Sequence, residues 1–174
     1  MTNDPFWRLP DVQALQVRSP DFEDGGRLPA WARARGAGGE DLSPELRWTG
    51  APPGTRSFVV RVFDPDAPTV SGFWHWAVYD LPAPLDHLEK GAGTPASGLL
   101  PAGAVTVANE YRSEQYAGAA PPAGHGEHRY VFIVSALDVD HLEVPAGATP
   151  AVLGFLLRTH ELARGATIGT SITD

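Results

Sequence analysis

The chain has 174 residues, of which 43% are hydrophobic and 20% are charged, and its formal net charge is -8. This length and apolar content are typical of one hydrophobic core, so we expect a single domain over residues 1–174. The acidic balance and the lack of a Lys/Arg cluster argue against a general nucleic-acid binder. The absence of cysteine excludes disulfide and thiolate chemistry.

The chain shows no targeting or membrane signal. It does not begin with a basic segment followed by an apolar stretch. It also has no run of about 18 apolar residues, the length that a membrane-spanning helix needs. We therefore expect a cytoplasmic protein without an integral membrane segment.

The N-terminal half predicts short strands separated by turns. Residues 15–19 alternate in polarity and indicate an edge strand, whereas residues 24–26 and 36–39 are glycine-rich and indicate a turn and a loop. Residues 58–63 are nearly all apolar and rich in β-branched or aromatic side chains. Because successive positions are apolar, both faces of this strand should be covered, as in a central strand.

Two further strands follow from alternation along the chain. In residues 73–81, alternation places His75 on one face and both Trp74 and Trp76 on the other. In residues 128–137, it places His128 and Tyr130 on the same face. The glycine- and proline-containing residues 91–103 are expected to form a long surface loop.

One helix is predicted near the C-terminus. Thr149 is a suitable N-cap, Pro150 suits the first helical position, and leucines recur at i, i+3 and i+4. The helix is expected to run to about residue 163, with Gly165 as its stop, and to pack its leucine side on a sheet.

An acidic turn rigidified by proline follows the first buried strand, over residues 64–68. The prolines restrict the backbone beside Asp64 and Asp66 and would hold these carboxylates in place. An ordinary turn, in which an Asp side chain bonds the nearby backbone, explains the same residues. The turn alone therefore leaves both interpretations open.

Two histidines lie close to proline-containing turns. His75 follows the acidic turn, and His128 follows Pro121 and Pro122. A lone histidine in a strand is more often a core residue than a ligand contact. Two histidines that follow two separate proline turns are more economically explained by a shared pocket. The remaining histidines are expected at solvated positions: His87, His125, His141 and His160.

These motifs together resemble the phosphatidylethanolamine-binding protein family, also called Raf kinase inhibitor-like, in its bacterial branch. The resemblance covers most of the chain and depends on the order in which the motifs occur. The motifs are Ser43-Pro44-Glu45-Leu46 with Trp48, Asp64-Pro65-Asp66-Ala67-Pro68, Gly72 with His75-Trp76, Pro121-Pro122, His128-Arg129-Tyr130 and the closing helix.

The resemblance implies a mainly β fold, an antiparallel Greek-key β-sandwich with a C-terminal helix and a small anion pocket at one end. By position, it implies that the following residues bind the ligand: Asp64, Asp66, Pro68, His75, Pro121, Pro122, His128 and Tyr130. Phe73 would form an aromatic wall of this pocket.

Such a pocket suits a small phosphorylated molecule or a phospholipid head group. Histidine N–H groups and the Tyr130 hydroxyl can donate to phosphate oxygens. An aspartate would repel phosphate, but it could accept from an amine or hold a histidine in its donating tautomer and raise the pKa of that histidine. We expect anion binding to strengthen as the pH falls toward about 6, near the ordinary histidine pKa.

The main alternative is an enzyme. Two acids and two histidines could bind a metal as a two-histidine-one-carboxylate site or could perform acid–base hydrolysis. The chain has no Gly-x-Ser-x-Gly, His-Glu-x-x-His or phosphate-loop motif. We therefore expect a binding protein that has no catalytic residue, metal or cofactor.

A second alternative is a protease or kinase inhibitor that acts through a protein–protein surface. Phe6, Trp7 and Trp31 are the candidate exposed aromatic residues, although buried packing is the more common role of such side chains. A homodimer and an unknown protein partner are both compatible with the resemblance.

Overall fold

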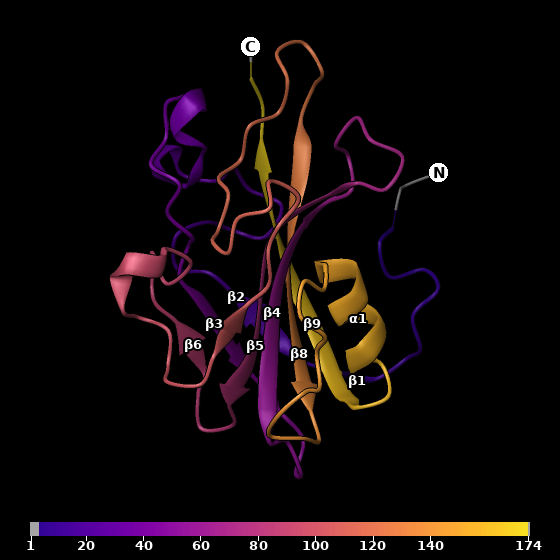
Figure 1. The fold of residues 1–174 in the computed structure, drawn as a ribbon. Coiled ribbons are helices and arrows are strands. Elements are labelled where there is room, and N and C mark those ends of the chain that lie inside the picture. The colour runs from indigo at the N-terminus through magenta and orange to yellow at the C-terminus, as the bar shows by residue number, and fades with distance from the viewer. Residues whose placement is uncertain (1–3, 174) are drawn as a thin grey trace.

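The computed structural model describes residues 4–173 and is mainly β, with one α-helix near the C-terminus (Figure 1). A six-stranded sheet has the order β1-β9-β8-β4-β5-β7, and a three-stranded sheet has the order β2-β3-β6. The predicted fold class is confirmed, although β1 and β9 pair in parallel and make the large sheet mixed. The elements are β1 (Gln13–Ala14), β2 (Gln16–Arg18), β3 (Leu46–Thr49), β4 (Ser57–Asp64), β5 (Phe73–Pro82), β6 (His87–Leu88), β7 (Val105–Thr106), β8 (His128–Leu137), α1 (Pro150–Leu157) and β9 (Glu161–Ser171), with short 3₁₀ turns at Ala30–Ala32, Arg35–Ala37 and Pro95–Ser97.

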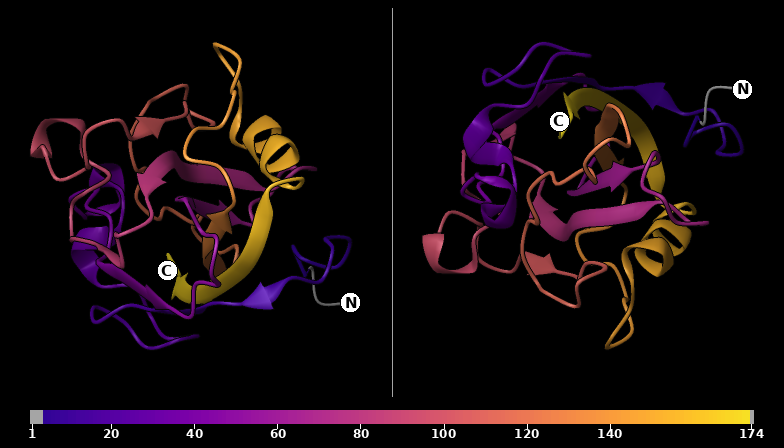
Figure 2. Two further views of the ribbon diagram at one scale, coloured as in Figure 1. Left: turned by 90° about the horizontal axis from the view of Figure 1, so that it is seen from below. Right: turned by 90° about the horizontal axis from the view of Figure 1, so that it is seen from above.

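Strand β4 lies at the centre of the large sheet and is covered on both faces, as its apolar sequence predicts. On one face, Phe58 packs against Trp48 of β3, with ring centroids 5.4 Å apart. On the other face, Val59 belongs to a second core cluster with Leu153 of α1. Figure 2 shows α1 and the small sheet on opposite sides of the large sheet. The large sheet therefore has a face covered by the small sheet, called here the small-sheet face, and a face covered by α1, called here the helix face.

The C-terminal segment differs from the sequence expectation. The helix ends at Leu157, and strand β9 occupies residues that were expected to extend the helix. It pairs with β8 from Ser171 opposite His128 to Glu161 opposite Leu137. A Cβ atom at Gly165 would lie 2.3 Å from the carbonyl oxygen of Leu15, so this glycine permits two backbones to approach closely and does not stop a helix.

A β-bulge interrupts strand β5 at His75. Trp74 pairs with Phe63 and Trp76 pairs with Val62, so His75 is an extra residue without a partner on β4. Alternation is broken at this point, and the prediction that both tryptophans share a face is wrong. Trp76 joins the core on the small-sheet face, whereas Trp74 stacks on Phe63 at 4.5 Å on the helix face. Bulges commonly re-aim a side chain beside a functional site.

The remaining predictions for regular structure agree with the fold. Strand β2 is an edge strand of the small sheet, within the segment predicted to be an edge. Residues 91–103 contain a 3₁₀ turn and no strand. Among residues 4–173, no helix has the length and apolar character to cross a bilayer.

Candidate functional site

The predicted polar residues meet at one end of the large sheet. Strand β4 ends at Asp64, while its antiparallel neighbours β5 and β8 begin at Phe73 and His128. Antiparallel pairing therefore brings the acidic turn beside the starts of both neighbours. The bulge in β5 then turns His75 toward Tyr130, and their rings contact edge to face with centroids 5.0 Å apart.

Asp64 and His128 form the buried centre of the site. The Nδ1 atom of His128 lies 2.8 Å from Oδ2 of Asp64, and the two side chains are only 2% and 4% exposed. The other carboxylate oxygen of Asp64 accepts the backbone N–H of Asp66 at 2.8 Å. With Asp64 ionised, Nδ1 of His128 is the donor, so Asp64 fixes both the orientation and the tautomer of this histidine.

His125 contacts the side of His128 that faces away from Asp64, and the sequence analysis did not place it in the site. Its side chain is exposed, as expected, but its Nδ1 atom lies 2.7 Å from Nε2 of His128. Gly124 and Gly126, on either side of it, have positive φ angles of 72° and 93°. These glycines permit the tight turn that folds His125 back over His128. A histidine between two glycines, followed by a second histidine three positions later, is the sequence pattern that could have indicated this contact.

His75 is held as a neutral side chain with one nitrogen already used. Its Nδ1 atom lies 2.8 Å from the carbonyl oxygen of Ala117, which can only accept a hydrogen bond. Burial lowers the pKa of His75, and this outweighs the raising effects of the Ala117 carbonyl and of Asp64. Asp64 acts on His75 in the expected direction, but burial has the larger effect and leaves the pKa of His75 below its ordinary value. Its Nε2 atom is left as an acceptor.

Aromatic side chains surround the histidines. Tyr130 is buried, and burial together with the charge of Asp64 raises the pKa of its hydroxyl, which keeps it protonated. Phe73 stacks on His75 with centroids 5.0 Å apart and on Tyr111 at 4.9 Å. Phe73 thus lies where the resemblance places an aromatic wall, and exposed Tyr111 extends that wall to the surface.

Asp66, which was expected to bind the ligand, is engaged elsewhere. Its carboxylate accepts hydrogen bonds from the backbone N–H, Nε and Nη2 of Arg129 at 3.0, 2.7 and 2.7 Å. These bonds hold the pKa of Asp66 below its usual value. In this arrangement Asp66 ties the acidic turn to strand β8 and does not face the histidines.

The three predicted prolines frame the site from its loops. Pro121 is buried, and the carbonyl of exposed Pro122 accepts the backbone N–H of His125 at 3.1 Å, which supports the turn over His128. Pro68 is exposed in the acidic turn. The prolines therefore shape the loops around the site and offer no polar side-chain group.

Two further polar residues support the site and had no motif in the sequence to indicate them. Buried Asn109 donates to the carbonyls of His75 and Gln115 at 3.4 and 3.0 Å, which connects the bulge to the loop that carries Tyr111. Arg33 donates to Oγ1 of Thr173 at 3.1 Å, and its buried Nε has no partner. The charge of Arg33 acts on Tyr130, so Arg33 supplies a cation close to the site.

The arrangement brings three histidines, a carboxylate and a tyrosine hydroxyl together, with His125 over Nε2 of His128. Within residues 4–173, no group of three or more His, Cys, Asp or Glu side chains is placed to hold a metal ion. No serine, threonine or lysine side chain in that part of the chain hydrogen-bonds to the ring of His75, His125 or His128. The fold and this cluster together define a β-sheet binding protein with a polar site at one end of its large sheet.

The chain belongs to the phosphatidylethanolamine-binding protein family, whose sequence profile matches residues 18–172. It is 44% identical to the UPF0098 protein YbhB of Escherichia coli over 153 residues, which cover 86% of this chain and 94% of that protein. It is 40% identical to the UPF0098 protein YbcL of the same organism over 152 residues, 86% of this chain and 83% of that protein. The resemblance drawn from the motifs is confirmed.

A solved structure shares the fold as well. The crystal structure of Escherichia coli YbcL, described as a new member of the mammalian family, superposes with a TM-score of 0.87. The match is 36% identical in sequence and covers 92% of this chain and 99% of the YbcL chain.

Proposed function

We propose that the protein binds a small phosphate-bearing group, either a phosphorylated small molecule or a phospholipid head group, at the site formed by Asp64, His75, His128 and Tyr130. The observation that carries this proposal is the buried Asp64–His128 pair beneath exposed His125. A buried ion pair seldom stabilises a fold more than apolar residues of the same volume would. Its position at the rim of a sheet, beside an exposed histidine, favours a role in binding.

The hydrogen-bonding capacity of each group suggests the form of the ligand. His128 and the Tyr130 hydroxyl can donate to phosphate oxygens, and Arg33 adds positive charge. Neutral His75 can only accept at Nε2 while its Nδ1 donates to Ala117. It would therefore pair with a protonated phosphate oxygen or with an amine. Phosphoethanolamine carries both kinds of group.

Access to the site would require His125 to move or to take part in binding. Because Nε2 of His128 is occupied by His125, a phosphate oxygen can reach it only when this contact opens. The flanking glycines, Gly124 and Gly126, allow such a rearrangement of the turn. Binding would then replace one histidine–histidine hydrogen bond with a charge-assisted one.

Calorimetric titration with phosphoethanolamine, inorganic phosphate and ethanolamine tests the proposal. We expect phosphoethanolamine to bind most tightly, and more tightly at pH 6 than at pH 8, because phosphate monoesters gain a proton near pH 6. His128→Ala should weaken binding at least about tenfold, which corresponds to the loss of one charge-assisted hydrogen bond. His75→Ala should also weaken it and should remove the preference for the protonated phosphate.

The chain offers matched controls for these variants. His160 pairs with Asp138 at 2.9 Å on the surface, away from the site, so His160→Ala removes a histidine–aspartate pair without touching the cluster. It should leave the affinity unchanged. Unchanged affinity in both His75→Ala and His128→Ala would overturn the proposal.

We also propose a binding role in preference to a hydrolytic one, and a cytoplasmic location. The support for the first is that, among residues 4–173, the histidine rings share no hydrogen bond with a serine, threonine or lysine side chain. Metal analysis of the purified protein and a phosphatase and esterase panel test it, and light scattering tests the expected homodimer. Hydrolysis that is lost in His128→Ala would favour the enzyme instead.

A further inference from the structure

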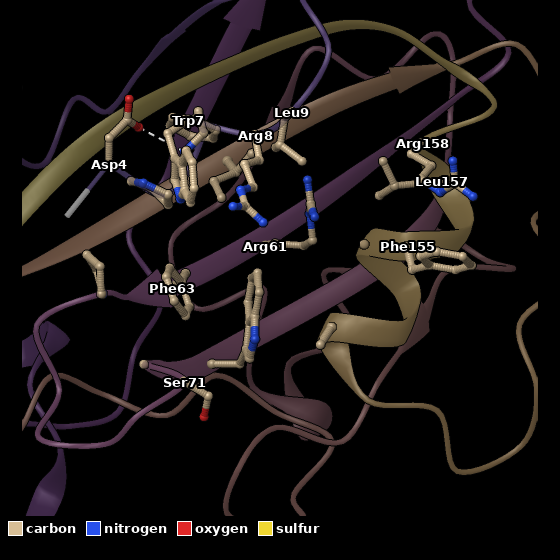
Figure 3. Close-up of a pocket in the computed structure, with 18 of the residues that line it drawn as sticks. Asp4, Trp7, Arg8, Leu9, Arg61, Phe63, Ser71, Phe155, Leu157 and Arg158 are labelled. Atoms are coloured by element: carbon tan, nitrogen blue, oxygen red, sulfur yellow. Dashed lines mark hydrogen bonds between the residues drawn. The ribbon is translucent and has the colours of Figure 1, made fainter.

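A second cavity lies on the helix face of the large sheet, and the histidine site does not use it. Its volume is about 640 Å³, within the range that small-molecule sites occupy. Residues 4–10, strand β4 and helix α1 form its walls (Figure 3). It therefore has the size of a ligand site and a boundary made from three distant parts of the chain.

Arg61 lies at the inner wall of this cavity as a buried cation. It is only 5% exposed, and its buried Nε atom has no hydrogen-bond partner. Its Nη2 atom donates to Oγ of Ser135 at 3.2 Å, which is a neutral partner. Desolvation lowers the pKa of Arg61 to about 10, so the side chain stays charged at neutral pH. A buried cation without a directly bonded carboxylate is costly unless a counter-ion reaches it.

The carboxylates close to this cavity meet that need only in part, because the charge of Glu161 raises the pKa of Arg61 but burial lowers it more. Glu161 accepts from Nε of Arg164 at 3.0 Å, forms a second contact with Arg164 Nη2, and accepts the Ser135 hydroxyl at 2.6 Å. Asp4 accepts the backbone N–H of Phe6 at 2.8 Å near the surface. Neither forms an ion pair with Arg61 in the part of the chain that the structure describes.

Two more arginines stand at the entrance. Arg8 lies over the ring of Trp7 at 4.1 Å, and Arg158 lies over the ring of Phe155 at 4.3 Å. Neither has a carboxylate partner among residues 4–173. Figure 3 shows Arg8 and Arg158 on either side of Arg61, one from the N-terminal segment and one from the residue that follows the last turn of α1. Three arginines therefore make the cavity complementary to an anion.

The rest of the lining is apolar and partly open to solvent. Phe63 and Trp74 form the floor, and Trp7 and Phe155 at the rim are 68% and 63% exposed. Large aromatic side chains at such exposure gain free energy when an apolar group covers them. A simple inorganic anion would satisfy the arginines but would leave this surface uncovered.

Gly154 of α1 keeps space for the buried arginine. A Cβ atom at this position would lie 2.8 Å from Nη1 of Arg61. The helix can therefore pack closely over β4 while the guanidinium remains beneath it. A larger residue at position 154 would require the guanidinium to shift.

We propose that this cavity binds an amphiphilic anion, a carboxylate or phosphate monoester with an apolar tail, whose head group pairs with Arg61 while the tail covers Phe63 and Trp74. Arg8 and Arg158 would attract the head group at the entrance. This site is separate from the histidine cluster, and ligand binding at one does not require binding at the other.

Titration with decanoate and with decyl phosphate, below their micellar concentrations, tests the proposal and distinguishes the two head groups. Tryptophan fluorescence is a suitable readout because Trp7 and Trp74 line the cavity. We expect saturable binding of at least one of these anions. Decanol, which has the same tail without charge, should bind at least tenfold more weakly. Equal binding of decanol would show apolar adsorption only and would overturn the proposal.

Substitutions of the three arginines test whether the anion binds in this cavity. Arg61→Met keeps the length and apolar stem of the side chain and should weaken anion binding at least tenfold. If that variant does not fold, the surface double variant Arg8→Gln/Arg158→Gln decides instead, with an expected loss of about threefold or more and a weaker dependence on salt.

Two controls separate this site from the histidine site. Arg47→Met removes an arginine that pairs with Glu45 on the small sheet, and it should leave decanoate binding unchanged. His128→Ala should also leave it unchanged. Loss of decanoate binding in His128→Ala, or its retention in both the Arg61 variant and the double variant, would overturn the assignment.

Discussion

Asp64 determines which proton His128 can offer to a ligand. Because the carboxylate occupies Nδ1, neutral His128 presents a lone pair at Nε2 and accepts from His125, whereas protonated His128 presents an N–H there. The three side chains thus form a line in which a proton on the buried histidine changes what the exposed histidine contacts. An ionised phosphate oxygen can only accept a hydrogen bond, so it would replace His125 only where Nε2 of His128 carries a proton.

His75 makes the stability of the fold depend on pH. Its pKa is lowered in the folded protein, mainly by burial, whereas in the unfolded chain it is near the ordinary value of about 6.5. Below about pH 6.5 the unfolded state therefore binds a proton that the folded state resists. The free energy of unfolding should be highest above this pH and should fall on acidification toward the folded pKa.

Urea denaturation at pH 7.5 and pH 5.0 measures this dependence. His75→Gln, which does not titrate, should show a smaller decrease in the free energy of unfolding between the two values than the native protein. His160→Gln, at a half-exposed position, should keep the native decrease. An identical pH dependence in the native protein and His75→Gln would contradict the assignment.

At the level of elements, the small residues of strand β9 allow other parts of the chain to pack closely against the sheet. The sequence of β9 is rich in Ala, Gly and Thr and has one large β-branched aliphatic side chain, Ile168, whereas β4 has three valines. The glycines stand where other parts of the chain press against the strand. Gly165 faces the Leu15 backbone, and Gly169 faces the side chain of Leu28, with a virtual Cβ at 2.3 Å from each.

Gly165→Ala should therefore destabilise the protein. The added methyl group would meet a backbone carbonyl, which cannot rotate away, so we expect a loss of about 1–3 kcal/mol, as for other overpacked sites. Gly36→Ala is the matched control, because nothing lies within 4 Å of a Cβ there. It should change stability by less than about 0.5 kcal/mol. Chemical denaturation compares them, and equal effects would argue against the close approach.

At the scale of the whole molecule, the C-terminal strand completes the sheet that holds the histidine site. Strand β9 pairs with β8 along the whole of His128–Leu137 and pairs with β1 on its other side. Without β9, β8 would become a long, exposed apolar edge. The N-terminal segment differs, since residues 4–10 contain no strand and belong to neither core cluster.

Truncation from the two ends should therefore have opposite outcomes. A chain that stops after Leu157 should not fold, whereas a chain that begins at Asp11 should keep its fold. Two-dimensional NMR spectra of both chains provide the measurement, with dispersed amide signals expected only for the second. Dispersed signals from the first chain would show that β9 is dispensable.

The sequence determined the fold class, the central strand and part of the polar cluster, namely Asp64, His75, His128 and Tyr130. These depend on local patterns: continuous apolar residues in β4, proline beside Asp64 and alternation that places His128 with Tyr130. Only the tertiary structure decided which of these residues meet. The bulge at His75, the pairing of Asp66 with Arg129 and the fold of His125 over His128 depend on contacts between strands and loops far apart in the chain. The buried Arg61 shows the same limit, because one arginine in an apolar strand does not reveal which helix and which terminal segment will enclose it.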